Sequence, residues 1–317
     1  MTNNGVMPPK VTVMIPCYNQ ENFIAQAIES VLMQDYENLE VVVADDCSTD
    51  QTGEIAQRYR SDLRYRYIRN AINRGRVENY RHTFENYTHG EWVVNLDGDD
   101  YYTDKHFITN AINNIRQAQQ QTVTPIVAYL YKHDNLEQIK RQLPHKEIST
   151  QCLLLSGGSY VLNYSKIGRF GHFSTLYRRD VAFRIGMYKL PVQASDFHAI
   201  IRVILNGDVL LDNRTIGVWR VHGQNTTITA LEHRQQETMQ TFEAIADYAR
   251  NFFSEQELMI WRKRMNRAAY YDYATTYIMH KRDLRALQLL IMSFRPSKSY
   301  IKLCFRYLFK GLKVSVL

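Results

Sequence analysis

The first hundred residues alternate between apolar runs and helical periods, and this alternation constrains the fold more than any other feature of the chain. Apolar runs predict strands at residues 11–16 and 39–44, a short third strand is predicted at residues 65–69, and residues 91–96 predict a mostly buried fourth strand. Apolar side chains at helical spacing predict helices between them, at residues 23–32, 55–59 and 77–87. This order predicts an α/β protein with a parallel sheet and helices on both faces.

Three polar clusters follow strands of the predicted sheet, at the ends where open parallel sheets bind ligands. They are residues 17–19, residues 45–46 and residues 97–100. The last cluster, Asp97-Gly98-Asp99-Asp100, gathers three carboxylates in one turn, and their mutual repulsion favours a bound cation. Such oxygen ligands suit Mg²⁺ or Mn²⁺, which keep positions for phosphate oxygens, so a nucleoside diphosphate is the predicted ligand. The alternative is an ordinary solvated acidic turn.

The chain beyond residue 115 alternates less regularly. Apolar runs that predict further strands occupy residues 126–131, 172–177, 209–211 and 216–221. Ser195-Asp196 starts a predicted helix that Gly207 ends, and Gly157-Gly158 predicts a turn or a mobile loop. From Thr226 onward the pattern is almost wholly helical, which predicts a separate helical appendage.

Composition narrows the classes of protein. With 317 residues and 45% hydrophobic residues, the chain can bury a large core. Lys and Arg exceed Asp and Glu by 39 − 32 = 7, which favours anionic partners without choosing among nucleotides, lipid head groups and nucleic acid. The four scattered cysteines indicate reduced thiols rather than zinc or disulfides. Without a secretion signal in residues 1–10 or a long apolar stretch, a cytoplasmic location is expected.

Eight motifs, taken in order, resemble the inverting family 2 nucleotide-sugar glycosyltransferases, which have the GT-A fold. The motifs are Val13–Asn19, Glu29–Gln34, Val41–Asp50, Asn73–Gly75, Gly90–Trp92, Leu96–Asp100, Ser195–Phe197 and Trp219–Thr226. The resemblance implies a Rossmann-like, mostly parallel sheet flanked by helices, followed by an all-helical C-terminal appendage.

The resemblance also implies a division of the chain into four parts. They are an N-terminal tail (1–10), a half that binds the nucleotide sugar (11–110), a half that binds the acceptor (111–228) and a helical C-terminal region (229–317).

Nucleoside contacts are implied by resemblance at the first two polar clusters. In this family the corresponding residues hold a nucleoside, most often uridine, which assigns that role to Pro16, Tyr18, Asp45 and Asp46. Arg74, in the loop after the third strand, is assigned a contact to the base or to a phosphate.

The resemblance also assigns contacts with the diphosphate and its metal, and the residues concerned come from two of the eight motifs that are far apart in the sequence. Asp97 would contact the ribose or a metal-bound water, and Asp99 would ligate the Mn²⁺ or Mg²⁺ ion that bridges the phosphates. His222 corresponds to a contact with the diphosphate or the metal, although a lone histidine is also a common structural residue. Arg220 is expected to steady the leaving phosphate, the alternative being a surface ion pair.

An inverting transfer needs one carboxylate to take the proton of the acceptor hydroxyl. Asp196 is the candidate base, although its place at a predicted helix start also suits a plain N-cap. Relatives commonly carry Glu-Asp here, whereas this chain has Ser195-Asp196, so contacts made by the missing Glu are in question.

The last residues, 296–317, form a predicted basic amphipathic helix. Its apolar face carries Ile301, Phe305, Leu308 and Leu312, with lysines and Arg306 on another face. Such a helix can lie on an anionic membrane surface, or it can pack on the domain with its lysines solvated. A peripheral location on the inner face of the cell membrane is therefore compatible with the sequence.

The function predicted first is metal-dependent, inverting transfer of a sugar from a UDP-sugar to a glycan or a lipid-linked saccharide during surface polysaccharide synthesis. A sugar nucleotidyltransferase is the alternative enzyme, but it would carry a Gly-rich phosphate loop where this chain has residues 16–21. A nucleic-acid-binding protein is supported only by net charge, and no nucleic acid partner is expected.

Overall fold

The computed structural model describes residues 7–131, 136–167, 170–189, 195–222, 231–280, 284–294, 300–301 and 304. The chain folds into two compact units, residues 1–222 and residues 223–317. The strands of the first unit's main sheet are β1 (Val11–Cys17), β2 (Leu39–Asp45), β3 (Tyr65–Arg69), β4 (Trp92–Asn95), β6 (Ile126–Leu130), β7 (Lys146–Ser149), β8 (Cys152–Ser156), β9 (Thr175–Arg178) and β10 (Asp208–Asp212).

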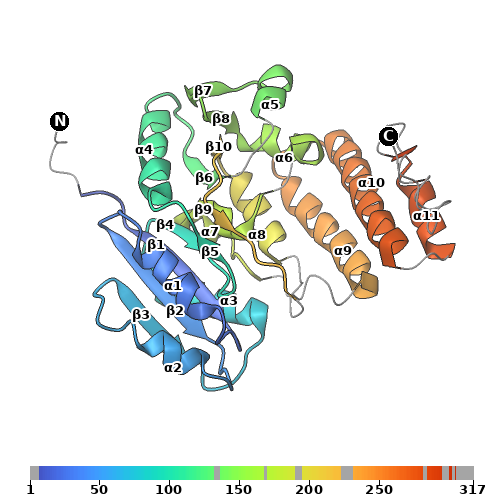
Figure 1. The fold of residues 1–317 in the computed structure, drawn as a ribbon. Coiled ribbons are helices and arrows are strands. Elements are labelled where there is room, and N and C mark those ends of the chain that lie inside the picture. Colours follow the sequence, from blue (N-terminus) through green and yellow to red (C-terminus); the bar gives the residue numbers. More distant parts are fainter. Residues whose placement is uncertain are drawn as a thin grey trace, which may run out of the picture. The chain divides into compact units, whose positions relative to one another are not determined.

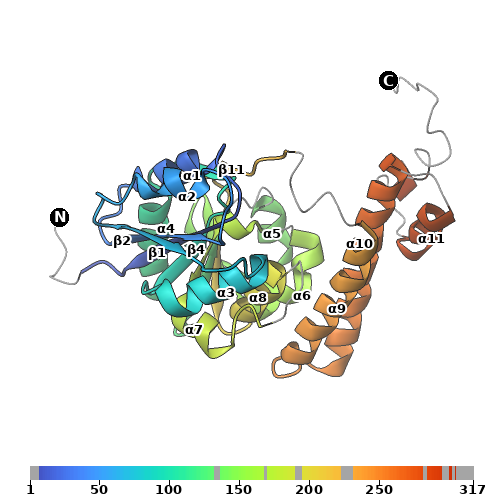
Figure 2. The same ribbon diagram turned by 90° about the horizontal axis from the view of Figure 1, so that it is seen from below.

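The helices of the first unit cover both faces of this sheet (Figures 1 and 2). They are α1 (Ile24–Leu32), α2 (Thr52–Gln57), α3 (Arg76–Tyr87), α4 (Phe107–Gln119), α5 (Leu136–Gln142), α6 (Gly157–Ile167), α7 (Arg179–Arg184) and α8 (Ser195–Ile204). Helices α1 and α2 lie on one face, whereas α3 and α7 lie on the other (Figure 2). The predicted arrangement of helices on both faces is confirmed.

The strand order of the main sheet is β3-β2-β1-β4-β9-β6-β10-β8-β7. Strands β3, β2, β1 and β4 are parallel neighbours, with Val13 opposite both Val41 and Val94. Strands β9 and β8 run against the other strands of the sheet, because each pairs antiparallel with both of its neighbours. The sheet is therefore mostly parallel, as predicted.

Apolar side chains on both faces of β1, β2 and β4 explain why these strands are mostly apolar in the sequence. Val13 and Val41 are fully buried on one face, and Met14, Val42 and Val93 are fully buried on the other. Burying a side chain of this size stabilises the fold by roughly 1.5–3 kcal/mol, so the centre of the sheet is a firm platform for the turns that follow its strands.

The structure corrects the prediction at Gly157-Gly158, which is not a loop but the first turn of α6. The amide of Gly157 donates to the carbonyl of Gly207 at 2.9 Å, and a Cβ on Gly157 would lie 1.8 Å from the carbonyl oxygen of Ile204. The glycine is thus required by close packing of α6 on the end of α8, rather than by a turn.

Two predicted strands are shorter in the structure. Residues 172–174 form the 3₁₀ turn η1 (His172–Ser174), where the Ser174 hydroxyl bonds to Gly171, and β9 starts only at Thr175. In the predicted strand 216–221, only β11 (Gly217–Val218) pairs, antiparallel to β5 (Tyr101–Tyr102). The chain then leaves the β5–β11 ladder, because the amide of Arg220 donates to the carboxylate of Asp100.

The second unit contains α9 (Leu231–Ala249), α10 (Glu255–His280) and α11 (Leu284–Met292), which confirms the helical C-terminal region. Ala274, Leu289 and Leu290 form a small buried cluster between α10 and α11. Among the described residues, no helix combines the length and hydropathy needed to cross a bilayer. The predicted division of the first unit into donor and acceptor halves stays a prediction.

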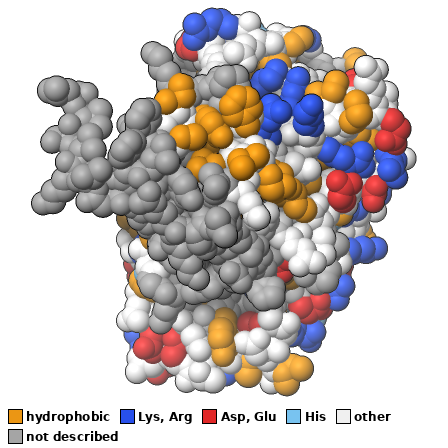
Figure 3. Space-filling model, turned by 90° about the vertical axis from the view of Figure 1, so that its right-hand side faces the viewer, with side chains coloured by type: hydrophobic (Ala, Val, Ile, Leu, Met, Phe, Trp, Pro, Cys, Tyr) orange, Lys and Arg blue, Asp and Glu red, His pale blue; other side chains and the backbone are white. Residues whose placement is uncertain are grey.

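Exposed apolar side chains also occur in the second unit. Met259, Ile291 and Phe294 are 62%, 66% and 60% exposed, and Lys263 and Arg264 on α10 are exposed as well. On the face drawn in Figure 3, hydrophobic side chains lie beside Lys and Arg side chains. The predicted helix 296–317 lies outside the described residues, apart from residues 300, 301 and 304.

Candidate active site

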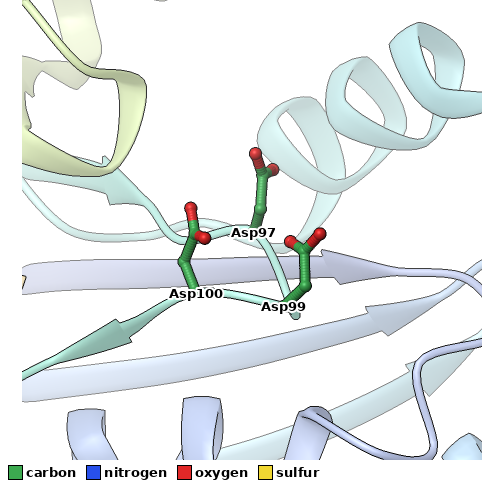
Figure 4. A group of neighbouring side chains, drawn as sticks. All are labelled: Asp97, Asp99 and Asp100. Atoms are coloured by element: carbon green, nitrogen blue, oxygen red, sulfur yellow. The ribbon is translucent and has the colours of Figure 1, made fainter. Parts of the chain in front are cut away.

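Asp97, Asp99 and Asp100 lie in the turn that joins β4 to β5, at the carboxyl edge of the sheet. One carboxylate oxygen from each lies within 4.8 Å of the others, and the three groups point to the same side of the turn (Figure 4). The amide of Asp100 donates to the carbonyl of Asp97 at 2.9 Å and closes the turn. A Cβ on Gly98 would lie 2.1 Å from Oε1 of Gln20 and 3.0 Å from Cβ of Cys17, so this glycine lets the turn pack closely on the residues after β1.

The electrostatics of this turn fit a bound divalent cation. Burial, reinforced by the charge of Asp99, raises the pKa of Asp97 to about 7. Burial also raises the pKa of Asp100 to about 8, and the charges of Asp97 and Asp99 add to this effect. A cation among these oxygens would offset both the burial and the repulsion, and hard carboxylate oxygens are the ligands that Mg²⁺ and Mn²⁺ prefer.

Arg220 reaches the acidic turn because the short β5–β11 ladder returns the chain to it. Its amide donates to Oδ1 of Asp100 at 2.8 Å, and its Nη1 donates to the carbonyl of Asp99 at 2.9 Å. Its guanidinium lies over the rings of Phe23 and Tyr101, at 5.0 and 4.7 Å from their centroids. These contacts hold a positive charge at the edge of the carboxylate cluster.

His222 lies at the same turn, 123 residues from the aspartate that it contacts. Its Nε2 is 2.9 Å from Oδ2 of Asp99, and its ring stacks on Phe23 with centroids 4.8 Å apart. The two predicted metal ligands are therefore neighbours, and the aromatic stack fixes the orientation of the imidazole. Residues 223–226 of the same motif lie outside the described residues.

Asp45 and Asp46, at the end of β2, are buried and bonded to protein groups. Asp45 accepts from the amide of Ser48 at 2.8 Å, the hydroxyl of Tyr67 at 2.8 Å and Nη1 of Arg69 at 2.9 Å. These bonds tie the turn after β2 to β3.

Asp46 orders the loop that carries Arg74. Its Oδ1 accepts from the amide of Arg74 and its Oδ2 from the amide of Gly75, both at 2.9 Å. Gly75 has a φ of 81°, which favours glycine, and α3 begins directly after it. Asp46 thereby fixes the first turn of α3 against the sheet edge.

The other two predicted nucleoside contacts differ in exposure. Pro16 is buried within β1, whereas Tyr18, just after the strand, is 45% exposed. Asn19, the next residue, has a φ of 52°, and its side-chain oxygen accepts from the amide of Thr49 at 2.8 Å. This bond joins the turns that follow β1 and β2, beside the open ring of Tyr18.

Asp196 lies in the first turn of α8 and is half-buried. Burial and the charge of Asp99 are the main causes of the raised pKa of Asp97, and the charge of Asp196 adds to them. The charge of Asp196 also raises the pKa of His172, against the larger lowering effect of burial. The predicted base and the predicted metal site are thus electrostatic neighbours, although they are about a hundred residues apart in the chain.

Sequence reasoning missed a buried polar network behind these groups. Asn95 donates to the hydroxyl of Tyr188 at 2.5 Å, accepts from Tyr177 at 3.1 Å and contacts Nε2 of His172. Burial lowers the pKa of His172 to about 4, so this imidazole is neutral at pH 7. The polar Asn95 inside an otherwise apolar run was the one signal in the sequence, because a buried amide needs partners.

A comparison with known proteins identifies the family. The model for glycosyl transferase family 2 matches residues 12–186, more than half of the chain. The chain belongs to glycosyl transferase family 2. Among the relatives of this chain, the uncharacterized glycosyltransferase RT0329 of Rickettsia typhi is 28% identical over 236 residues, which are 72% of this chain and 69% of that protein.

TarS, a poly(ribitol-phosphate) beta-N-acetylglucosaminyltransferase of Staphylococcus aureus, is a second relative of this family 2 chain. It is 38% identical over 94 residues, which are 29% of this chain and only 16% of TarS. The crystal structure of its residues 1–349 with UDP-GlcNAc matches with a TM-score of 0.67 and 19% identity, covering 93% of this chain and 81% of that one.

A third match is a mannosyltransferase, PcManGT of Pyrobaculum calidifontis, in complex with GDP-Man and Mn²⁺. The TM-score is 0.58 and the identity 18%, with 98% of this chain and 92% of that chain covered. At these identities the two structures establish the fold alone, and that fold is the predicted GT-A fold.

Proposed function

We propose that this protein is an inverting, metal-dependent hexosyltransferase that moves a sugar from a UDP-sugar to a glycan or a lipid-linked saccharide in surface polysaccharide synthesis. The observation that carries the proposal is the meeting of the acidic turn with Arg220 and His222 at the carboxyl edge of the sheet. The UDP-GlcNAc complex of TarS supports a UDP-linked donor, and the name of that enzyme supports a polymeric acceptor.

Mn²⁺ or Mg²⁺ is the proposed cofactor, with Asp99 and His222 as its protein ligands and Asp97 facing the ribose or a metal-bound water. The cluster of three carboxylates and the raised pKa of Asp97 support a cation here. The Mn²⁺ complex of the mannosyltransferase also supports it. When bound, such a cation supplies positive charge to the diphosphate leaving group.

The nucleoside of the donor is held by residues at or after the ends of the first three strands. The exposed ring of Tyr18 offers its face to the base, while Pro16, Asp45, Asp46 and Arg74 complete the nucleoside pocket. The bonds that Asp45 and Asp46 make to their neighbours support a part for them in shaping this pocket.

Asp196 is the proposed general base. In a single displacement, the acceptor hydroxyl attacks the anomeric carbon from the face opposite the leaving diphosphate, and Asp196 takes its proton. Arg220 keeps a positive charge beside the leaving phosphate, supported by its contacts to Asp99 and Asp100. One displacement inverts the anomeric configuration and requires no covalent intermediate.

Action at the cytoplasmic face of the cell membrane is part of the proposal. The exposed apolar and basic side chains of the second unit support contact with a membrane surface. Family membership favours sugar transfer over the alternative of a sugar nucleotidyltransferase, and nothing beyond net charge favours nucleic acid.

A panel of UDP-GlcNAc, UDP-glucose, UDP-galactose and GDP-mannose tests this function. Thermal shift and slow donor hydrolysis are measured with Mn²⁺ and with excess chelator. A UDP-sugar should stabilise and be hydrolysed only with Mn²⁺, and Asp99→Asn should lower hydrolysis by about a hundredfold or more. Asp180→Asn, at an aspartate 63% exposed on its side chain, is the control and should behave as wild type. Full turnover in chelator would contradict the proposal.

A further inference from the structure

A cleft of about 380 Å³ opens beside the first turn of α3. Its lining includes the cations Arg74, Arg76, Arg81 and Lys189, and one acid, Glu78. The formal charge of this lining is 4 − 1 = +3, and Glu78 pairs with Arg81 at 2.7 Å. A concave surface with this excess of positive charge attracts anions.

The walls of the cleft are fixed by the fold. Asp46 holds the amides of Arg74 and Gly75, which sets the start of α3. On the other wall, Tyr188 is buried with a φ of 65°, a costly conformation for a bulky side chain. The side-chain amide of Asn95 donates to its hydroxyl at 2.5 Å, and Nε2 of His172 lies 3.1 Å from the same hydroxyl, which holds the ring there. Strain maintained in this way is typical of functional sites.

The wall of the cleft is tied to the elements that carry the groups assigned to catalysis. The hydroxyl of Tyr188, in the lining, accepts a hydrogen bond from Asn95 at the end of β4, two residues before the acidic turn. Nη1 of Arg202 on α8 donates to the carbonyl of Gly186, two residues before Tyr188, at 3.4 Å. One wall of the cleft is thus bonded both to the strand that leads to the acidic turn and to α8, the helix that carries Asp196 in its first turn.

We propose that this cleft binds an anionic group of the acceptor, a phosphate or carboxylate carried by the saccharide, and makes the enzyme selective for anionic acceptors. The inference rests on the proposed function and deepens it by naming the acceptor's chemical class. Guanidinium groups suit it because they hold oxyanions with paired N–H donors. The donor diphosphate is the competing occupant, because Arg74 in the lining is also assigned to the donor, and the experiment separates the two.

The test is calorimetric titration of the full chain with sn-glycerol 3-phosphate, in saturating UDP and Mn²⁺, with glycerol as the uncharged probe. Wild type should bind the phosphate ester and not glycerol. Arg81→Ala and Lys189→Ala should each weaken that binding about fivefold, the range of exposed ion pairs, and the double variant by more than tenfold. Raising the salt concentration should weaken it further.

Controls make each outcome decisive. Lys166→Ala removes an exposed lysine of α6 outside the cleft and should bind as wild type does. The affinity for UDP with Mn²⁺ should be equal in all variants. The proposal is overturned if the ester does not bind, if both cleft variants bind it as Lys166→Ala does, or if they lose UDP to the same extent as the ester. If wild type fails to bind any nucleotide with Mn²⁺, the proposed function fails. Titration with sn-glycerol 3-phosphate in the absence of nucleotide then still tests whether the cleft binds an anion.

Discussion

At the scale of single residues, the aspartates at the carboxyl edge of the sheet differ in what their oxygens touch. Asp45 and Asp46 accept hydrogen bonds from amides, a hydroxyl and a guanidinium, so their charge is already compensated by the protein. Asp97 and Asp100 lie among other carboxylates, which adds to the effect of burial on their pKa values. The first pair orders loops, whereas the second favours a cation.

Asp196→Asn tests the base. The amide keeps the shape of the side chain but cannot take the proton, so kcat should fall by about 10²- to 10⁴-fold. The affinity for UDP with Mn²⁺, measured by calorimetry, should stay within twofold, because Asp196 is not assigned to the donor. Transfer within tenfold of wild type would reassign the base.

Asp100 predicts a pH dependence of stability in the metal-free protein. Its pKa rises from about 3.9 in an unfolded chain to about 8, chiefly through burial. A carboxyl with a raised folded pKa contributes stability at low pH and loses it as pH rises to the folded pKa. Stability in chelator should therefore fall between about pH 4 and pH 8.

Asp100→Asn should remove part of this fall, because an amide does not ionise yet can still accept from Arg220, while Asp97, whose pKa burial raises to about 7, still contributes. In chelator at pH 8 the variant should be more stable than wild type by about 2 kcal/mol, and near pH 4 the two should be equal. Denaturant unfolding at both pH values measures the difference. Equal stabilities at pH 8 would show that Asp100 carries no such penalty.

At the scale of elements, α6 depends on the absence of a side chain at its first residue. Gly157→Ala would push a methyl group into the backbone at the end of α8, and overpacking of this kind costs about 1–3 kcal/mol. Gly158→Ala is the matched control, since this glycine is half-exposed within the same helix, where a change to alanine is expected to be neutral or slightly stabilising. Equal unfolding midpoints for the two variants would contradict the packing account.

Elements built from local patterns could be predicted from the sequence, and those built from distant pairing could not. The strands β1, β2 and β4 lie in mostly apolar runs, and β3 is a short strand between two helical patterns, so these strands and their parallel order followed directly. The β5–β11 ladder pairs only two residues with two, too few for a periodic signal. Gly157 was predicted to lie in a turn because the sequence does not distinguish a glycine required by close packing from a glycine required by a turn.

The candidate active site shows the same difference between local motifs, which could be predicted, and distant contacts, which could not. The acidic turn was visible as a local motif, while the contact of His222 with Asp99 was suggested by resemblance and is seen only in three dimensions. The bonds of Asn95 to His172 and Tyr188 span 77 and 93 residues, and no spacing rule connects them. The cleft beside α3 was likewise missed because it joins residues 74–81 to residues 188–189.

At the scale of the whole molecule, the chain joins a GT-A unit to a helical unit with exposed apolar and basic side chains. Deleting residues 296–317 should lower association with vesicles containing anionic lipid by at least tenfold, because each basic residue near such a surface contributes about 1 kcal/mol. Donor hydrolysis in solution should persist. Association equal to that of the full chain would leave this segment without a membrane role.

The central claim is that the acidic turn captures a divalent cation and a nucleoside diphosphate together, across from Asp196. The most direct measurement is a crystal structure of the full chain with UDP and Mn²⁺, with the ion located by anomalous scattering. We predict one strong peak at Asp99, bridged to both phosphates, with Asp196 facing the open side. A manganese peak elsewhere, or UDP bound away from residues 97–100, would contradict this account.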